Sequence, residues 1–182
     1  MSAYRPEFEA ALRLFARASE AMKAQGYGVP ILVGGGAVEL YSNSAITTGD
    51  FDIVTPRQEE FERQLVTLGF EKPQGLGHTP LGWVHPTLRL GFEIVSSTLY
   101  DGMADRDRVV LVDLGDDGEA AIVAIEDLIA DRMGQYASGS APEMLEQARR
   151  LYRLHADADR GYMEGRIRHE SAGDYGVSDL EP

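Results

Sequence analysis

The 182-residue sequence contains no cysteine. This absence excludes disulfide bonds, zinc–thiolate sites and catalysis by a cysteine nucleophile. It also fits a reducing compartment, so we predict a cytoplasmic protein. Long apolar runs are absent as well. No stretch reaches the roughly 18 apolar residues of a membrane span, and the N-terminus lacks a basic segment followed by an apolar run. We therefore expect neither membrane insertion nor export.

Lysine is scarce, since 15 of the 17 basic residues are arginine, and the net charge is -13. This balance argues against a protein that coats nucleic acid by bulk electrostatics, which requires clustered basic residues to neutralise phosphates. Arginine recognises phosphate through two parallel hydrogen bonds. A local arginine-lined groove that holds a nucleotide or an RNA end is therefore still compatible with this composition. For most of these arginines, the simpler interpretation is a solvated helix surface.

Apolar residues make up 43% of the chain, which is typical of a globular protein with one good core. Apolar spacing and turn residues predict helices over residues 7–25, 37–41, 56–68, 126–136 and 142–155, and strands over 29–33, 48–55, 88–95, 109–114 and 120–123. We predict an α/β core with its N-terminal helix over residues 1–123, a helical portion over 124–165 and a flexible tail over 166–182.

The glycine triplet Gly34-Gly35-Gly36 lies between a short apolar strand and a helix. Glycines at such a turn let the backbone approach a phosphate closely, and the helix after the turn presents its positive end and free N–H groups. A glycine triplet by itself is more often a packing device. Its interpretation therefore depends on the residues downstream of it.

Two acidic residues come after the triplet in Thr48-Gly-Asp-Phe-Asp-Ile-Val, and Glu93 lies later in an alternating strand. Because side chains of a strand alternate between its faces, Asp50 and Asp52 point the same way while Phe51 points into the core. Mg²⁺ prefers oxygen ligands and takes one or two carboxylates together with substrate phosphate oxygens. The pattern favours a cradle for a nucleoside triphosphate (NTP) and its metal ions.

The stretches Leu32-Val-Gly-Gly-Gly-Ala-Val and Gly49-Asp-Phe-Asp-Ile-Val, with Glu93 beyond them, resemble the signature of the DNA polymerase β-like nucleotidyltransferase superfamily. Ile125-Glu-Asp-Leu-Ile-Ala-Asp-Arg-Met and Glu146-Gln-Ala-Arg, with Asp159 and Tyr162, resemble the helical portion of small prokaryotic members, including relatives of AbiEii-type toxins. The resemblance covers residues 29–165. It implies a nucleotidyltransferase fold of class α/β (α+β), with a mixed β-sheet flanked by helices and a C-terminal helical extension.

The resemblance also implies the site. Asp50, Asp52 and Glu93 would be the catalytic residues and would hold Mg²⁺ or Mn²⁺, with Asp101 as an alternative to Glu93. The nucleotide-binding residues would be Gly34, Gly35, Gly36, Thr48 and Arg89. For Arg89 an ion pair with a neighbouring carboxylate is an equal alternative. Gly49 departs from relatives that carry Thr or Arg before the first aspartate.

These residues support three functional hypotheses. The first is a metal-dependent transfer of a nucleoside monophosphate from NTP to a hydroxyl of RNA, such as a tRNA 3′ end, or of protein, by the toxin of a toxin–antitoxin or phage-defence system with an antitoxin partner. The second is a catalytically silent nucleotide-binding or interaction module of such a system. The third is a metal-dependent nuclease, which uses the same carboxylates.

Two other groups of residues have simpler explanations. His78 and His85 could reach a base or transfer a proton, although structural or surface roles are the commoner case for histidine. Arg149, Arg150 and Arg153 spread around a predicted helix and are interpreted as a solvated surface, with contact to RNA or a second NTP as the alternative.

Overall fold

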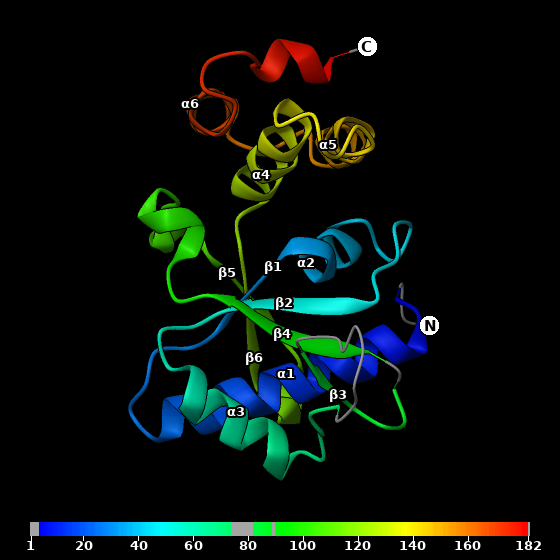
Figure 1. The fold of residues 1–182 in the computed structure, drawn as a ribbon, viewed down its shortest axis with the longest axis vertical. Helices are drawn as coiled ribbons and strands as arrows, with labels where there is room; N and C mark the ends of the chain where they lie inside the picture. The colour runs from blue at the N-terminus through cyan, green and yellow to red at the C-terminus, as the bar shows by residue number, and fades with distance from the viewer. Residues whose placement is uncertain (1–3, 74–81, 89, 182) are drawn as a thin grey trace. The chain divides into compact units, whose positions relative to one another are not determined.

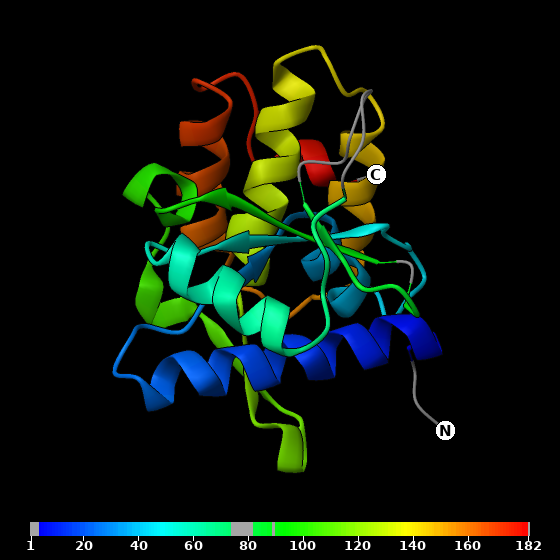
Figure 2. The same cartoon turned by 60° about the horizontal axis from the view of Figure 1, so that its bottom comes forward.

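The computed structural model describes residues 4–73, 82–88 and 90–181. The chain divides into two compact units, Met1–Val123 and Ala124–Pro182. Their elements are shown in Figures 1 and 2. Among the described residues, none of the helices is both long and apolar enough to cross a membrane.

The first unit is built on a six-stranded sheet with the order β3-β4-β2-β1-β6-β5. The strands are β1 (Ile31–Val33), β2 (Asp50–Val54), β3 (Trp83–Val84), β4 (Gly91–Ser96), β5 (Val110–Asp113) and β6 (Glu119–Ile122). The central strand β1 runs antiparallel to β2 and parallel to β6, and β2 runs parallel to β4. The outer strands β3 and β5 are antiparallel to their neighbours. The predicted mixed sheet flanked by helices is confirmed.

Helices cover both faces of this sheet. They are α1 (Pro6–Ala24), α2 (Gly34–Tyr41) and α3 (Gln58–Thr67). Figure 1 shows α1 and α3 on one side of the sheet and α2 on the other. Three short 3₁₀ turns, η1 (Leu99–Gly102), η2 (Arg106–Arg108) and η3 (Gly115–Asp117), lie around β5 in the sequence.

An aromatic core joins the sheet to α1 and α3. Phe51 of β2 and Phe92 of β4 stack with their ring centroids 4.9 Å apart, because the parallel register sets them side by side. Phe15 of α1 packs edge-on against both rings and against Phe61 of α3. All four rings are fully buried. The core thus fixes which face of β2 and β4 is turned away from α1.

The second unit is helical. It contains α4 (Ile125–Ala137), α5 (Met144–Leu154), α6 (Arg160–Glu170) and the 3₁₀ turn η4 (Val177–Leu180). Within it, α4 packs against both α5 and α6.

The structure differs from the predicted flexible tail over residues 166–182. Residues 166–170 complete α6, and η4 comes after them. Ile167 and Leu180 are fully buried, and the Glu164 carboxylate accepts a 2.6 Å hydrogen bond from the Val177 N–H. The apolar positions that anchor this segment are few and lie among polar residues, so the sequence lacks the usual amphipathic period there.

The predicted start of the third helix was also wrong. The Thr55-Pro56 pair resembles an N-cap with proline in the first turn, but α3 begins only at Gln58. The Thr55 N–H donates to the Ser96 carbonyl at 3.0 Å, which continues the pairing of β2 with β4. The Thr55 hydroxyl accepts from the Arg57 N–H at 3.2 Å, so it closes a turn between β2 and α3, and the helix begins after this turn.

Candidate functional site

The three predicted carboxylates lie on one face of the sheet. In the parallel pairing of β2 with β4, Asp50 is opposite Gly91 and Asp52 is opposite Glu93. Phe51, between the two aspartates, is fully buried on the α1 side. Because side chains alternate along a strand, Asp50, Asp52 and Glu93 occupy the opposite face, which α2 covers in part.

The glycine triplet forms the first turn of α2 and lies against this face. Gly34 has φ +57°, and a Cβ atom built there would overlap the Asp52 carboxylate. The Gly35 N–H donates to Asp52 Oδ2 at 3.1 Å, and a Cβ on Gly35 would overlap Thr48 Oγ1. Side chains at these two positions would therefore displace Asp52 and Thr48.

Gly36 has a different environment from the two glycines before it. It is buried, and a Cβ atom there would lie 2.9 Å from Leu32 Cδ1. Close packing of α2 on β1 accounts for the lack of a side chain at this position.

A fourth glycine shapes the other side of the site. A Cβ atom on Gly91 of β4 would lie 2.5 Å from Asp50 Oδ1. Asp50 therefore reaches over β4, whereas Asp52 turns toward the start of α2. For the residues described, no group of three Asp, Glu, His or Cys side chains is placed to hold a metal ion.

Two carboxylates on one strand face still suit Mg²⁺. This ion is usually bound by one or two protein carboxylates, with substrate phosphate oxygens and water as further ligands. Asp50 is exposed and Asp52 is partly exposed, so both can reach a ligand from solvent. The donor set fits a cation that arrives together with a triphosphate.

Thr48 precedes the aspartates and is held by its backbone and its side chain. Its Oγ1 atom donates to the Asp50 carbonyl at 3.0 Å and accepts from the Asp50 N–H at 3.3 Å. The hydroxyl thus closes a tight turn at the start of β2, next to Gly35. Arg89, the other predicted phosphate ligand beyond the glycines, lies outside the described residues.

Glu39 was missed by the sequence analysis, although it is fully buried one turn along α2 from the triplet. Its carboxylate accepts hydrogen bonds from Arg5 Nε at 2.6 Å, the Thr48 N–H at 2.7 Å and Ser44 Oγ at 2.9 Å. Burial would raise the pKa of Glu39, but these donors outweigh it and lower the pKa. In the sequence Glu39 stands between Val38 and Leu40 with no pattern that marks it.

The structure also places the other residues that the sequence singled out as candidates. Asp101 lies in η1, beyond the end of β4, whereas Glu93 lies within β4 beside Asp52. The His85 ring packs edge-on against Phe70, and its Nδ1 atom is 3.0 Å from Thr87 Oγ1. His78 is outside the described residues.

Two of the three C-terminal arginines, Arg149 and Arg153, are bound within the second unit. Arg149 donates to the Asp179 carbonyl from Nε at 3.0 Å and from Nη2 at 2.9 Å, which fastens η4 to α5. Arg153 pairs with Glu146 at 3.0 Å. These contacts hold parts of the second unit together, so we interpret them as structural.

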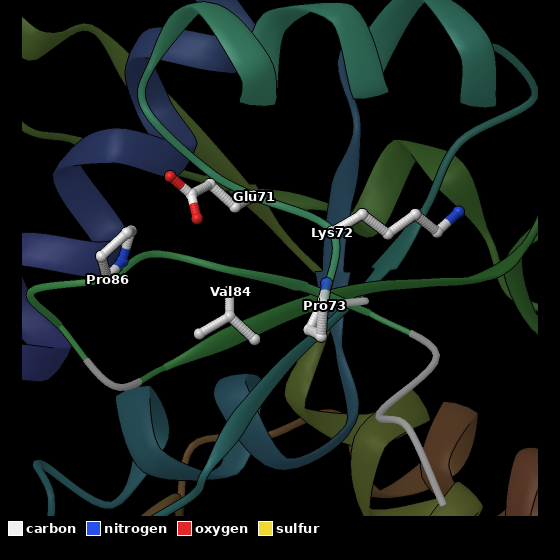
Figure 3. A pocket seen from close by; sticks show the side chains of 5 residues that line it. All are labelled: Glu71, Lys72, Pro73, Val84 and Pro86. Carbon is white, nitrogen blue, oxygen red and sulfur yellow. The ribbon is translucent and has the colours of Figure 1, made fainter. Parts of the chain in front are cut away.

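A pocket of about 680 Å³ lies at the outer strand β3 (Figure 3). It is lined by Glu71, Lys72, Pro73, Val84 and Pro86. Val84 pairs with Gly91, which in turn pairs with Asp50, so Val84 lies in the same row and on the same sheet face as Asp50. The pocket itself includes none of the predicted catalytic residues.

No protein-family model matches this sequence, and a comparison with curated proteins finds no match. Solved structures do match. The crystal structure of an antigenic nucleotidyltransferase-like protein from Paracoccidioides brasiliensis has 13% identity and a TM-score of 0.62, over 97% of this chain and 93% of that one. The solution structure of the antibiotic-resistance factor ANT(2'')-Ia has 15% identity and a TM-score of 0.56, over 90% of this chain and 92% of that one. This chain therefore has the fold of nucleotidyltransferase-like proteins.

Proposed function

We propose that the protein is a metal-dependent nucleotidyltransferase that moves a nucleoside monophosphate from NTP to a hydroxyl of RNA or protein. The observation that carries this proposal is the meeting of the α2 glycine turn with the aspartates of β2, where Gly34 leaves no room for a side chain beside Asp52. The fold shared with nucleotidyltransferase-like proteins supports it.

In this proposal each element has one task. The N-terminal end of α2, with its positive partial charge and backbone N–H groups, binds the triphosphate. Asp50 and Asp52 hold Mg²⁺ or Mn²⁺. Such an ion, when bound, neutralises charge on the phosphate oxygens and lowers the cost of displacing pyrophosphate.

The transfer is a single displacement. The acceptor oxygen attacks the α-phosphorus, the bond from that phosphorus to the bridging oxygen breaks, and pyrophosphate leaves. The proton of the acceptor hydroxyl passes to a carboxylate, and Glu93, opposite Asp52 on β4, is our assignment for it.

A tRNA 3′ end is the first acceptor to test. The role as a toxin with an antitoxin partner stays a prediction from the sequence resemblance. A silent nucleotide-binding module is the second candidate, and one observation favours it: the described residues do not bring three metal-binding side chains together.

The test incubates purified protein with each NTP labelled at the α-phosphate, with Mg²⁺ and either tRNA or cell protein. Label in the acceptor supports the transferase. Bound but unchanged NTP supports the module, and shortened RNA supports the nuclease.

The decisive variants are Asp50→Asn and Asp52→Asn, which keep side-chain size and remove the charge. We expect each to lower transfer at least about 100-fold, as for loss of an essential electrostatic group. The matched control is Asp116→Asn, which removes an exposed carboxylate in η3, at the β5–β6 turn. Transfer that persists at wild-type rate in both site variants would exclude the metal assignment.

A further inference from the structure

Glu39 and Arg5 connect three segments around the candidate site. Arg5, which precedes α1, donates to Glu39 through Nε at 2.6 Å and through Nη2 at 2.9 Å. Arg5 Nη2 also donates to the Thr48 carbonyl, and Glu39 Oε2 accepts from the Thr48 N–H at 2.7 Å. Both backbone polar groups of Thr48 are thus held by one ion pair.

Through its hydroxyl, Thr48 contacts two parts of the candidate site. Its hydroxyl bonds the backbone of Asp50 at 3.0 and 3.3 Å, which sets where β2 begins. The same hydroxyl lies where a Cβ atom of Gly35 would be, so it is in contact with the glycine turn. Through Thr48, the ion pair therefore joins the aspartate strand to the helix that carries the glycines.

The carboxylate of this pair is both buried and extensively hydrogen-bonded. Glu39 is fully buried, and four donors surround its carboxylate. An ion pair with a buried carboxylate adds little net stability compared with a well-packed apolar pair, because the buried charge loses its hydration. What such a pair can supply is one defined geometry, since its hydrogen bonds are directional.

We propose that Arg5 and Glu39 are positioning residues, which set the separation between the glycine turn and Asp50 and Asp52 and thereby tune cation binding. This inference rests on the proposed function of the same site. Neither residue is assigned as a ligand. Their effect on the cation runs through Thr48 and the start of β2.

The test measures Mn²⁺ affinity of the full-length protein by electron paramagnetic resonance, for wild type and for Glu39→Gln. The substituted glutamine keeps the size of the side chain but loses the charge that holds Arg5. We expect Mn²⁺ to bind about 10-fold more weakly or worse, the cost usual for a residue that supports metal ligands. An unchanged affinity in folded Glu39→Gln protein would overturn the proposal.

Asp127→Asn is the matched control, because Asp127 forms a buried ion pair with Arg166 in the second unit. It should leave Mn²⁺ affinity within about twofold of wild type. Equal losses of affinity in both variants would mean that any damaged core weakens the site, and this would also overturn the proposal. If Glu39→Gln fails to fold, Arg5→Lys replaces it, since Arg5 is partly exposed and lysine keeps the charge without the paired hydrogen bonds.

A metal-free readout separates this inference from the proposed function. The amide of Gly35, which bonds Asp52, is followed by NMR chemical shift and hydrogen exchange in both proteins. Faster exchange of the Gly35 amide in Glu39→Gln supports positioning even if wild-type protein binds no Mn²⁺, in which case only the metal assignment fails. An unaltered Gly35 amide contradicts positioning whatever the metal result.

Discussion

The first unit pairs the buried Glu39 with the partly exposed Arg5, and the second unit pairs Asp127 with Arg166, both of which are buried, yet the two carboxyl groups have pKa shifts of opposite sign. Four donors surround Glu39, and its pKa is lowered despite burial. For Asp127, burial, together with the negative charge of Glu126, raises the pKa by more than Arg166 and Tyr162 lower it. The number and placement of the hydrogen-bond donors therefore help to decide the sign of the pKa shift of a buried carboxyl group, and one nearby cation does not by itself lower the pKa.

The hydrogen bonds explain the difference. Asp127 accepts from Arg166 Nε at 2.6 Å and from the Tyr162 hydroxyl at 3.1 Å, with no backbone N–H among its described donors. Arg166 shares its charge with Glu170 at 2.7 Å, and its Nη1 atom is buried with no hydrogen-bond partner among the described residues. The network of the second unit is thus less completely satisfied than that of the first.

Glu39→Ala should break the better-satisfied network and have the largest effect. We expect the free energy of unfolding to fall by about 3–5 kcal/mol, because the Thr48 N–H loses its acceptor and Arg5 loses its counter-ion. Urea unfolding followed by the fluorescence of Trp83, the single tryptophan, measures this in the first unit. A loss below about 1 kcal/mol would remove the distinction between the two networks.

Asp127→Asn should cost less, about 1–2 kcal/mol. Asparagine keeps an oxygen for Tyr162, and Arg166 retains Glu170 as its counter-ion. Far-UV circular dichroism during urea unfolding follows the helices of both units, and its difference from the Trp83 fluorescence transition reports on the second unit. A cost as large as that of Glu39→Ala would reverse the comparison.

The pH dependence should differ in sign. Glu39, with its lowered pKa, stabilises the fold above the ordinary carboxyl range and loses this contribution as the pH falls through the lower folded pKa. Asp127, with its raised pKa, makes the fold more stable as the pH falls through the folded pKa toward the ordinary value of about 4.

The pH effect is measured as the stability difference between wild type and each variant, from neutral pH downward. The stability difference between wild type and Glu39→Ala should become smaller in acid, whereas wild type should become more stable relative to Asp127→Asn as Asp127 takes up its proton. Parallel curves for the two variants would contradict opposite pKa shifts.

Arg153→Ala provides the smallest expected effect. Arg153 pairs with Glu146 at 3.0 Å, but the side chains are 51% and 71% exposed. A solvated pair of this kind contributes about 0.5 kcal/mol or less. A loss above about 1 kcal/mol would show that exposure is a poor guide to the value of these ion pairs.

Much of the fold could be predicted because its signals are local. The alternation around Phe51 placed Asp50 and Asp52 together on one strand face, and the spacing in residues 7–25 predicted α1. Segments with weak periodicity could not be predicted in this way. Thr55 closes a turn with Arg57 and α3 begins only at Gln58, and α6 with η4 formed where few apolar residues break a polar sequence.

The sequence by itself determined the strand faces, the glycine turn and the order of the motifs, because these depend on backbone geometry over a few residues. Only the tertiary structure decided that Asp52 turns toward Gly35 while Asp50 reaches over Gly91. It also decided that Glu39 meets Arg5, which lies 34 residues earlier in the chain. Such contacts depend on how strands and helices pack, and no local sequence pattern predicts this packing.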